Sequence, residues 1–157
     1  MKIEETVGTL AGAGRKFGIV AARVNSRIID PLVAGAVDCL LRHGVAAADV
    51  RLVRVPGAWE IPGALEELAL AGNLHGLVAL GVVIRGETPH FDFLCAECSR
   101  GIAAVTERHR SPVGFGVLTC DNSTQAQERA GGKAGNKGWE AALAALEMAD
   151  LFAQLKA

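Results

Sequence analysis

Along this chain, nearly continuous apolar runs alternate with stretches in which apolar residues recur at helical spacing. Four apolar runs predict strands, and they span residues 17–22, 49–55, 76–84 and 113–119. The third run is unbroken, which is typical of a strand buried on both faces, as in a parallel sheet. Between and after the runs, apolar residues recur at helical spacing. Helices are therefore expected at about residues 26–43, 60–71, 91–108 and 139–155, with a short one from about residue 123.

The order of these elements predicts the fold class. Strands that alternate with helices form right-handed crossovers, so the strands lie parallel and helices cover both faces of the sheet. In such sheets, ligands bind just beyond the carboxyl ends of the strands. The residues alone therefore indicate a flavodoxin-like α/β sheet with a polar site at the strand ends. Residues 1–16 are Gly-rich and weakly patterned, and we expect a loose arm or a short strand that pairs elsewhere.

Several residues mark the expected ends of the first two helices. Asn25 or Ser26 can cap the first helix, and Gly44 can end it in a left-handed conformation. Pro31 fits this helix only if it lies in the first turn, where no backbone N–H is needed. Gly72 is expected to end the second helix in the same way as Gly44.

The last third of the chain carries its own cap and break signals. Ser123 or Thr124 can cap the short helix, with Gln127 placed to close a capping box on Thr124. The Gly-rich stretch 131–138 then breaks that helix before the last one begins.

Composition excludes several classes of function. With 16 basic and 17 acidic residues the net charge is −1, so the chain has no bulk attraction to nucleic acid or anionic lipid. No apolar stretch is as long as a membrane span, and the N-terminus does not resemble a secretory signal. We expect a cytoplasmic protein with four reduced cysteines. Cys95 and Cys98 have redox or zinc spacing, but no second Cys/His pair completes a metal site.

The loop after the third strand carries the densest chemistry in the chain. His90 can take or give a proton near neutral pH, and it lies close to Arg85. Gly86, Glu87 and Thr88 can offer backbone N–H groups and a hydroxyl to an anion, although the carboxylate of Glu87 opposes that charge. The alternative is that His90 is a helix-cap or core histidine.

Two further clusters belong to the same expected edge of the sheet. In residues 56–62, Trp59 offers a flat apolar face and Glu60 can accept hydrogen bonds from hydroxyls. The alternative is a turn whose tryptophan fills the core and whose glutamate caps a helix. Arg129 precedes the Gly-rich break, where a guanidinium suits a bidentate phosphate contact. A solvated surface arginine is the alternative there.

Four separated motifs in this order resemble one known family. They are VPGAWEIP at residues 55–62, GETPHFD at 86–92, FGVLT at 115–119, and QERAG with NKG within 127–138. From Phe17 onward nearly the whole chain is similar to 6,7-dimethyl-8-ribityllumazine synthases of riboflavin biosynthesis. The resemblance implies a flavodoxin-like three-layer sandwich, with a four-stranded parallel sheet flanked by helices. It also implies a single domain at 17–157, preceded by an arm at 1–16 that can pair with a neighbouring subunit.

The resemblance further implies an activity. The family condenses 5-amino-6-(D-ribitylamino)uracil with 3,4-dihydroxy-2-butanone 4-phosphate, releasing phosphate and water, and it uses no cofactor or metal. By this resemblance His90 is the proton-transfer residue. Arg129 would bind the leaving phosphate, with backbone and hydroxyl contacts from Glu87 and Thr88.

The same resemblance assigns residues to the ring and the ribityl chain. Ala58 and Glu60 would hold the ribityl chain, and Trp59 would shape the ring pocket. Val83 and Ile84 would contact the pyrimidine edge through their backbone.

The remaining family positions include one departure. Phe115, Arg129 and Lys137 are implied to come from the neighbouring subunit. Val24 stands where the family usually has an aromatic residue that stacks on the heterocycle, so ring stacking is expected to be weaker here.

Assembly and partners are also implied by the resemblance. We expect a homo-oligomer, a pentamer and an icosahedral shell of sixty subunits, because the short connection at 131–138 resembles that of shell-forming relatives. Riboflavin synthase is a candidate partner. The alternative function is a catalytically weak flavin-binding or lumazine-binding protein, or a shell-forming protein, of the same fold. A phospho-receiver domain shares the fold class but needs acidic residues where this chain has Ala21, Ala22 and Arg23.

Overall fold

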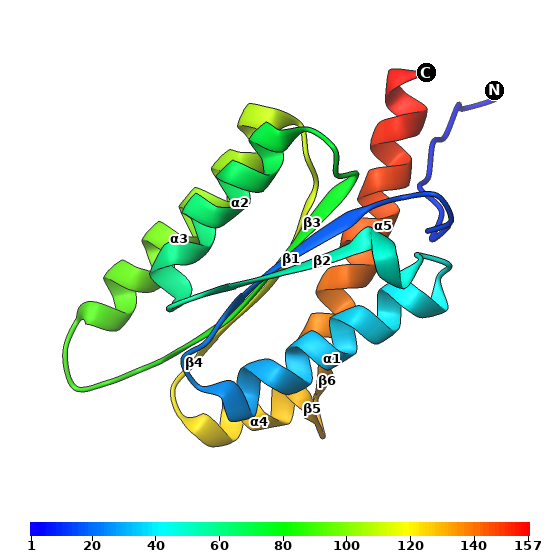
Figure 1. Ribbon diagram of the computed structural model, residues 1–157. Coiled ribbons are helices and arrows are strands. Elements are labelled where there is room, and N and C mark those ends of the chain that lie inside the picture. The colour runs from blue at the N-terminus through cyan, green and yellow to red at the C-terminus, as the bar shows by residue number, and fades with distance from the viewer.

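A four-stranded parallel sheet lies at the centre of the computed structural model, which describes residues 1–157 (Figure 1). Its strand order is β2-β1-β3-β4, the order of flavodoxin-like folds. The strands are β1 (Phe17–Ala22), β2 (Val50–Val55), β3 (Gly76–Ile84) and β4 (Val113–Cys120). The predicted fold class is confirmed.

Helices cover both faces of this sheet. One layer holds α1 (Ser26–Arg42) and α5 (Lys137–Lys156), with α4 (Ser123–Arg129) at its end, and the other holds α2 (Ile61–Ala71) and α3 (His90–His109) (Figure 1). The connections contain the short helices η1 (Ala47–Asp49) and η2 (Ala58–Glu60) and the hairpin β5 (Ala130–Gly132) and β6 (Gly135–Asn136). None of the helices combines the length and the apolar character that crossing a membrane requires.

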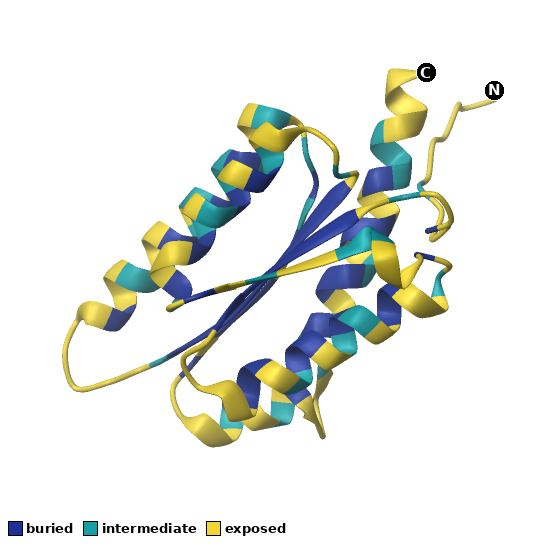
Figure 2. Ribbon diagram, viewed as in Figure 1, coloured by how far each residue is buried: buried dark blue, intermediate teal, exposed yellow.

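Burial follows the position of each strand in the sheet (Figure 2). β1 is buried at every residue and β3 at all but its last, because helices cover both faces of these central strands. β2 and β4 form the edges, and both have exposed positions. The continuous apolar run at 76–84 thus has the burial expected from its pattern.

The predicted helix ends are partly confirmed. Gly44 and Gly72 adopt positive φ angles of 98° and 73°, as expected where helices stop. Asn25 is the N-cap of α1, but its side chain makes no capping bond and its backbone is left-handed. The expectation for Pro31 is wrong, because this residue lies beyond the first turn of α1. The buried side chains of Ile29 and Leu32 flank it, and their packing keeps the helix continuous.

The cap of α4 also differs from the prediction. Asn122 is the N-cap, and its side chain accepts a hydrogen bond from the Gln125 amide at 2.9 Å. The Gln125 side chain accepts in turn from the Asp121 amide at 2.8 Å. The reciprocal cap therefore begins before Ser123, since Asn is as good a capping residue as Ser.

Asn136 joins the Gly-rich stretch to two helices. Its Oδ1 caps α5 by accepting from the amides of Gly138 and Trp139, at 2.8 and 3.1 Å. Its Nδ2 donates to the Pro31 carbonyl of α1 at 3.0 Å. A Cβ on Gly138 would collide with the carbonyl of Leu32, so α1 and α5 approach this closely only with glycine there.

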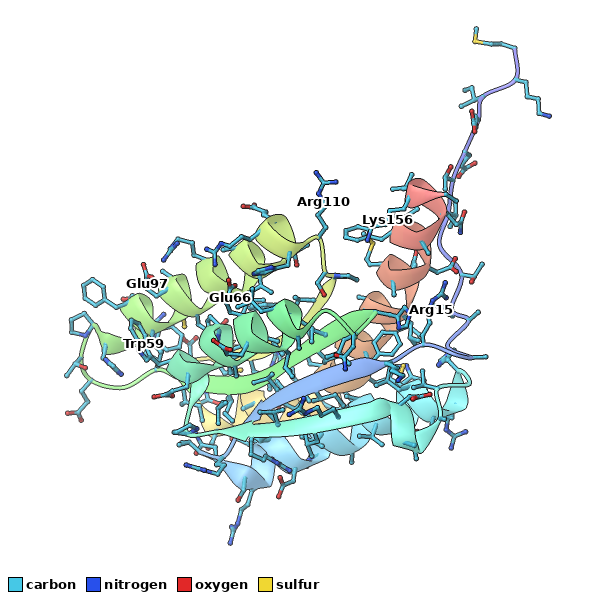
Figure 3. The ribbon with its side chains drawn as sticks, turned by 45° about the horizontal axis from the view of Figure 1, so that its top comes forward. Arg15, Trp59, Glu66, Glu97, Arg110 and Lys156 are labelled. Carbon is cyan, nitrogen blue, oxygen red and sulfur yellow. The ribbon has the colours of Figure 1, made fainter.

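The arm at residues 1–16 contains no helix or strand, and its second half packs on its own chain. Asp150 of α5 accepts from the Thr9 amide at 2.7 Å and pairs with Arg15 at 2.9 Å (Figure 3). Hydrogen bonds from Thr9, Gln154 and Arg15 lower the pKa of Asp150 to about 2, so this anchor is ionised throughout the neutral range. Pairing of the arm with a neighbouring subunit stays a prediction.

The first testable prediction concerns Asn136. Replacing Asn136 with Ala removes the α5 cap and leaves the Pro31 carbonyl without its donor. We expect a loss of about 1–3 kcal/mol in the free energy of unfolding, measured by urea denaturation at fixed protein concentration. The matched control is Asn122→Ala, which removes one exposed cap bond and should cost about 1 kcal/mol. An equal or smaller loss in Asn136→Ala would contradict the joining role of this side chain.

Candidate functional site

The main candidate site lies where β1 and β3 end. From β1 the sheet extends to β2 on one side and to β3 on the other, so the chain leaves these two strands in opposite directions. Ligands of open α/β sheets bind in the crevice at this point. A cavity of about 220 Å³ lies there, and we call it the β1–β3 cavity. It is lined by Ala22, Val24, Gly57, Ala58, Trp59, Glu60, Val82, His90 and Leu94.

The η2 turn forms one wall of the β1–β3 cavity. The Gly57 amide donates to Glu60 Oε2 at 3.0 Å, which closes the turn. Cys98 of α3 donates its thiol to the Ala58 carbonyl at 3.3 Å and so holds the turn against α3. Burial raises the pKa of Cys98 to about 11, so its thiol remains protonated at neutral pH. Its contact with Ala58 gives this cysteine a structural role.

The structure contradicts one half of the alternative for Trp59 and Glu60 and agrees with the other half. Trp59 is 61% exposed at the rim of the cavity, so it does not fill the core of this chain (Figure 3). Glu60 does close a helical turn, as the alternative expected, but it uses only Oε2 for that bond. Oε1 remains free to accept from a ligand hydroxyl.

β3 contributes Val82 to the lining of the cavity, whereas Val83 and Ile84 are not lining residues, and the backbone of the strand is open near its end. β1 pairs with β3 only as far as Leu80, whereas β4 pairs with it as far as Ile84. The Arg85 amide donates to the Cys120 carbonyl of β4 at 2.9 Å. Because successive residues of a strand face opposite sides, Val83 directs its backbone groups toward β4 and Ile84 directs its own away from it. The Ile84 amide and carbonyl therefore have no strand partner on that side.

His90 reaches the cavity as the first residue of α3. Pro89 precedes it as the N-cap, with the φ of −69° that proline favours at a helix start. Leu94 lies one turn later on the same face and also lines the cavity. The imidazole of His90 is exposed and makes no hydrogen bond within the chain, so both ring nitrogens are available. Glu87 and Thr88 lie exposed in the preceding loop and line neither this cavity nor the next one.

A second cavity, here called the β4 cavity, opens beside the edge strand β4. Its volume is about 370 Å³. It is lined by Phe115, Val117, Leu118, Thr119, Cys120, Arg129, Ala134, Lys137 and Glu140. The β4 side chains form an apolar floor, and the cations come from the ends of α4 and α5. This combination suits a phosphate group next to an apolar ring or chain.

The two cations of the β4 cavity, Arg129 and Lys137, contact residues that are close to them in sequence. Arg129 donates to the Gln125 carbonyl at 3.0 Å, and its Nη1 lies 3.9 Å from Glu128. Lys137 Nζ lies 3.9 Å from Glu140. These contacts orient both cations while the guanidinium and the ammonium remain nearly half exposed, so an anion can approach them.

The two cavities share no lining residue. Val24, Ala58, Trp59, Glu60 and His90 come together in one. Phe115, Arg129 and Lys137 come together in the other. Sequence reasoning missed Leu94 and Glu140, although each lies one helical turn after a residue that it singled out. No group of three or more His, Cys, Asp or Glu side chains is arranged to hold a metal ion.

Comparison with known proteins gives one family. A family model described as 6,7-dimethyl-8-ribityllumazine synthase matches residues 14–153. Three similar proteins carry that name. The one from Aquifex aeolicus (strain VF5) is 54% identical over 149 residues, which cover 95% of this chain and 97% of that protein. The one from Desulfovibrio desulfuricans is 54% identical over 154 residues, with 96% and 99% covered. The one from Chlorobaculum tepidum is 50% identical over 155 residues, with 99% and 100% covered.

Proposed function

The chain belongs to the 6,7-dimethyl-8-ribityllumazine synthase family, and on this premise we propose that its active site forms between the β1–β3 cavity of one subunit and the β4 cavity of a neighbour. The chain is an enzyme that condenses 5-amino-6-(D-ribitylamino)uracil with 3,4-dihydroxy-2-butanone 4-phosphate, releasing phosphate and water. No finding favours the alternative of a catalytically weak binding or shell-forming protein.

The β1–β3 cavity is the proposed place of the ribityl pyrimidine. The free amide and carbonyl of Ile84 can bond the polar edge of the ring, with Val83 beside it closing the strand against β4. Val24 and Trp59 supply apolar walls to the ring. The free Oε1 of Glu60 and the backbone of the turn at Ala58 accept from the hydroxyls of the ribityl chain.

The β4 cavity of a neighbour is the proposed place of the phosphate. Arg129 offers a planar fork to the phosphate oxygens, and Lys137 adds a second cation. Phe115 packs against the apolar part of the substrates. Glu87 and Thr88, exposed in the loop before α3 of the first subunit, offer their backbone amides to the same anion.

This arrangement supplies the chemistry that the reaction needs. Joining the amine to the ketone releases water, and the departing oxygen must receive a proton. His90 lies at the mouth of the β1–β3 cavity with both nitrogens available, so it can move that proton. Phosphate leaves as an anion beside Arg129 and Lys137. Holding the two reactants in one geometry can supply about 7–11 kcal/mol in favourable cases.

One observation carries the shared site. His90 and Arg129 line separate cavities that share no lining residue, so a substrate held in the β1–β3 cavity beside His90 is not held by Arg129 in that same cavity. Contact between the β1–β3 cavity of one copy and the β4 cavity of the next closes this gap. Such a head-to-tail contact generates a ring when its rotation closes.

We further propose a cytoplasmic homo-oligomer in the form of a pentamer, with pentamers joined into an icosahedral shell. The connection between α4 and α5 is a tight hairpin at β5 and β6, which adds little bulk to the surface between pentamers. Residues 1–6 precede the anchored part of the arm and contain no proline, so they can pair with a neighbour. Riboflavin synthase remains a candidate partner.

The kinetic prediction contrasts His90 with Arg129. His90→Ala should lower kcat by about 10²–10⁴-fold with little change in either KM, because proton transfer is lost while binding is kept. Arg129→Ala should chiefly raise the KM for the phosphorylated ketone. Arg129→Lys should remain impaired, since an ammonium cannot reproduce the planar fork. Steady-state kinetics with each substrate varied in turn measure all of these effects.

Two results would contradict these roles. If His90→Ala lowered kcat by less than about threefold at saturating substrates, His90 would not be the proton-transfer residue. Equal rises in KM for both substrates in Arg129→Ala would indicate an arginine that only supports the structure. Absence of turnover in the wild-type protein would contradict the function itself.

The assembly prediction is tested by analytical ultracentrifugation near neutral pH. We expect a large species of shell mass, with pentamers as its dissociation product. A single species of pentamer mass at all protein and phosphate concentrations would refute the shell but leave the shared site intact. A monomer that turns over both substrates would refute the pentamer and the shared site together.

A further inference from the structure

Arg85 lies at the junction between the end of β3 and the loop that leads to His90. Its Nε donates to Asp121 Oδ1 at 2.9 Å, and its Nη1 lies 3.6 Å from Asp92 Oδ1. Its guanidinium carbon lies 4.4 Å from the centre of the Phe91 ring. One side chain therefore contacts both the first turn of α3 and the residue that follows β4.

The far end of this contact is firmly held. Asp121 directly follows β4, and its amide donates to the Gln125 side chain of α4 at 2.8 Å. Asn122 caps the same helix through the Gln125 amide at 2.9 Å. Asp121 is thus fixed by a strand end and a capped helix, and it offers Arg85 a rigid anchor.

The loop between Arg85 and α3 has no such support of its own. Residues 86–88 make no hydrogen bond within the chain, so only the ends of the loop are fixed. Phe91, under the guanidinium, is 9% exposed and packs into the core. The Arg85 guanidinium lies over this buried ring and reaches Asp92, so its contacts join the beginning of the loop to the turn of α3 that carries His90.

The shape of the guanidinium matters more here than its charge. A planar group can stack on an aromatic ring while its N–H groups point outward in the plane, and an ammonium cannot do both. Arg85 and the two carboxylates are each about half exposed or more, at 49%, 68% and 64%. Exposed ion pairs contribute little to stability, so the consequence of this cluster should appear in geometry rather than in unfolding.

We propose that Arg85 is a positioning residue, which fixes the 86–88 loop and the start of α3 against Asp121 so that His90 and the phosphate-binding amides keep their places. This inference rests on the proposed function, because it assigns a consequence to the placement of His90. Arg85 itself lines neither cavity and is not expected to touch substrate.

The test compares Arg85→Gln with Arg100→Gln. Arg100 is the matched control, because it is also an exposed arginine paired with a carboxylate of α3: it lies in α3 and its Nη2 is 2.8 Å from Glu97 Oε2. Arg85→Gln should lower kcat by about 10- to 100-fold, since a small misplacement of a reacting group is costly. It should also raise the KM for the phosphorylated ketone more than that for the ribityl pyrimidine, because the η2 turn does not contact Arg85. Arg100→Gln should change each value less than about twofold.

Two further variants separate positioning from folding. Arg85→Lys should recover only part of the activity, and Asp121→Asn should lower kcat in the same direction as Arg85→Gln. Tm should differ from the wild-type value by no more in Arg85→Gln than in Arg100→Gln. Equal kinetics of Arg85→Gln and Arg100→Gln, full rescue by lysine, or a loss of activity explained by a lower Tm would each overturn the proposal. An inactive wild-type protein would instead count against the proposed function, so the two failures are distinguishable.

Discussion

The difference in length between two neighbouring strands is the constraint on which the site depends. β3 continues beside β4 to Ile84, but its pairing with β1 stops at Leu80. Backbone N–H and C=O groups need hydrogen-bond partners, and those of half-buried Ile84 at the end of β3 have no strand partner on one side. The η2 turn, the end of β1 and the start of α3 line the β1–β3 cavity together with Val82 of β3, so Glu60, Val24 and His90 share one cavity next to the end of β3.

The second consequence concerns what one subunit lacks. The residue proposed to transfer the proton and the cations proposed to bind phosphate line cavities that share no residue, although both sets come from elements that pack on the same sheet. On the proposed function, activity depends on assembly, since the proposed site is complete only where two copies meet. Arg85 adds a link inside the subunit. It contacts the start of α3, where His90 lies, and Asp121, whose amide donates to Gln125 of α4, the helix that ends with Arg129.

Much of the fold follows from local pattern, whereas the site follows from contacts between distant segments. The burial of β1 and β3 and the stops at Gly44 and Gly72 need only apolar runs and left-handed glycines. The position of Pro31 inside α1, beyond the first turn, does not follow from local pattern, because the buried residues on both sides of it keep the helix continuous. The Asn136 contact with α1 and the division into two cavities could not be predicted from pattern, since each joins residues far apart in the sequence.

Mixed oligomers test the shared site most directly. His90→Ala and Arg129→Ala subunits would be dissociated, combined in equal amounts and reassembled. In a closed ring, each site takes one half from each of two neighbouring subunits, and each half is intact in about half of the cases. Both halves are therefore intact in about a quarter of the sites, so about a quarter of the wild-type activity should return. Separately reassembled variants, mixed only afterwards, give the baseline. Activity no higher than this baseline would contradict an active site built from two subunits.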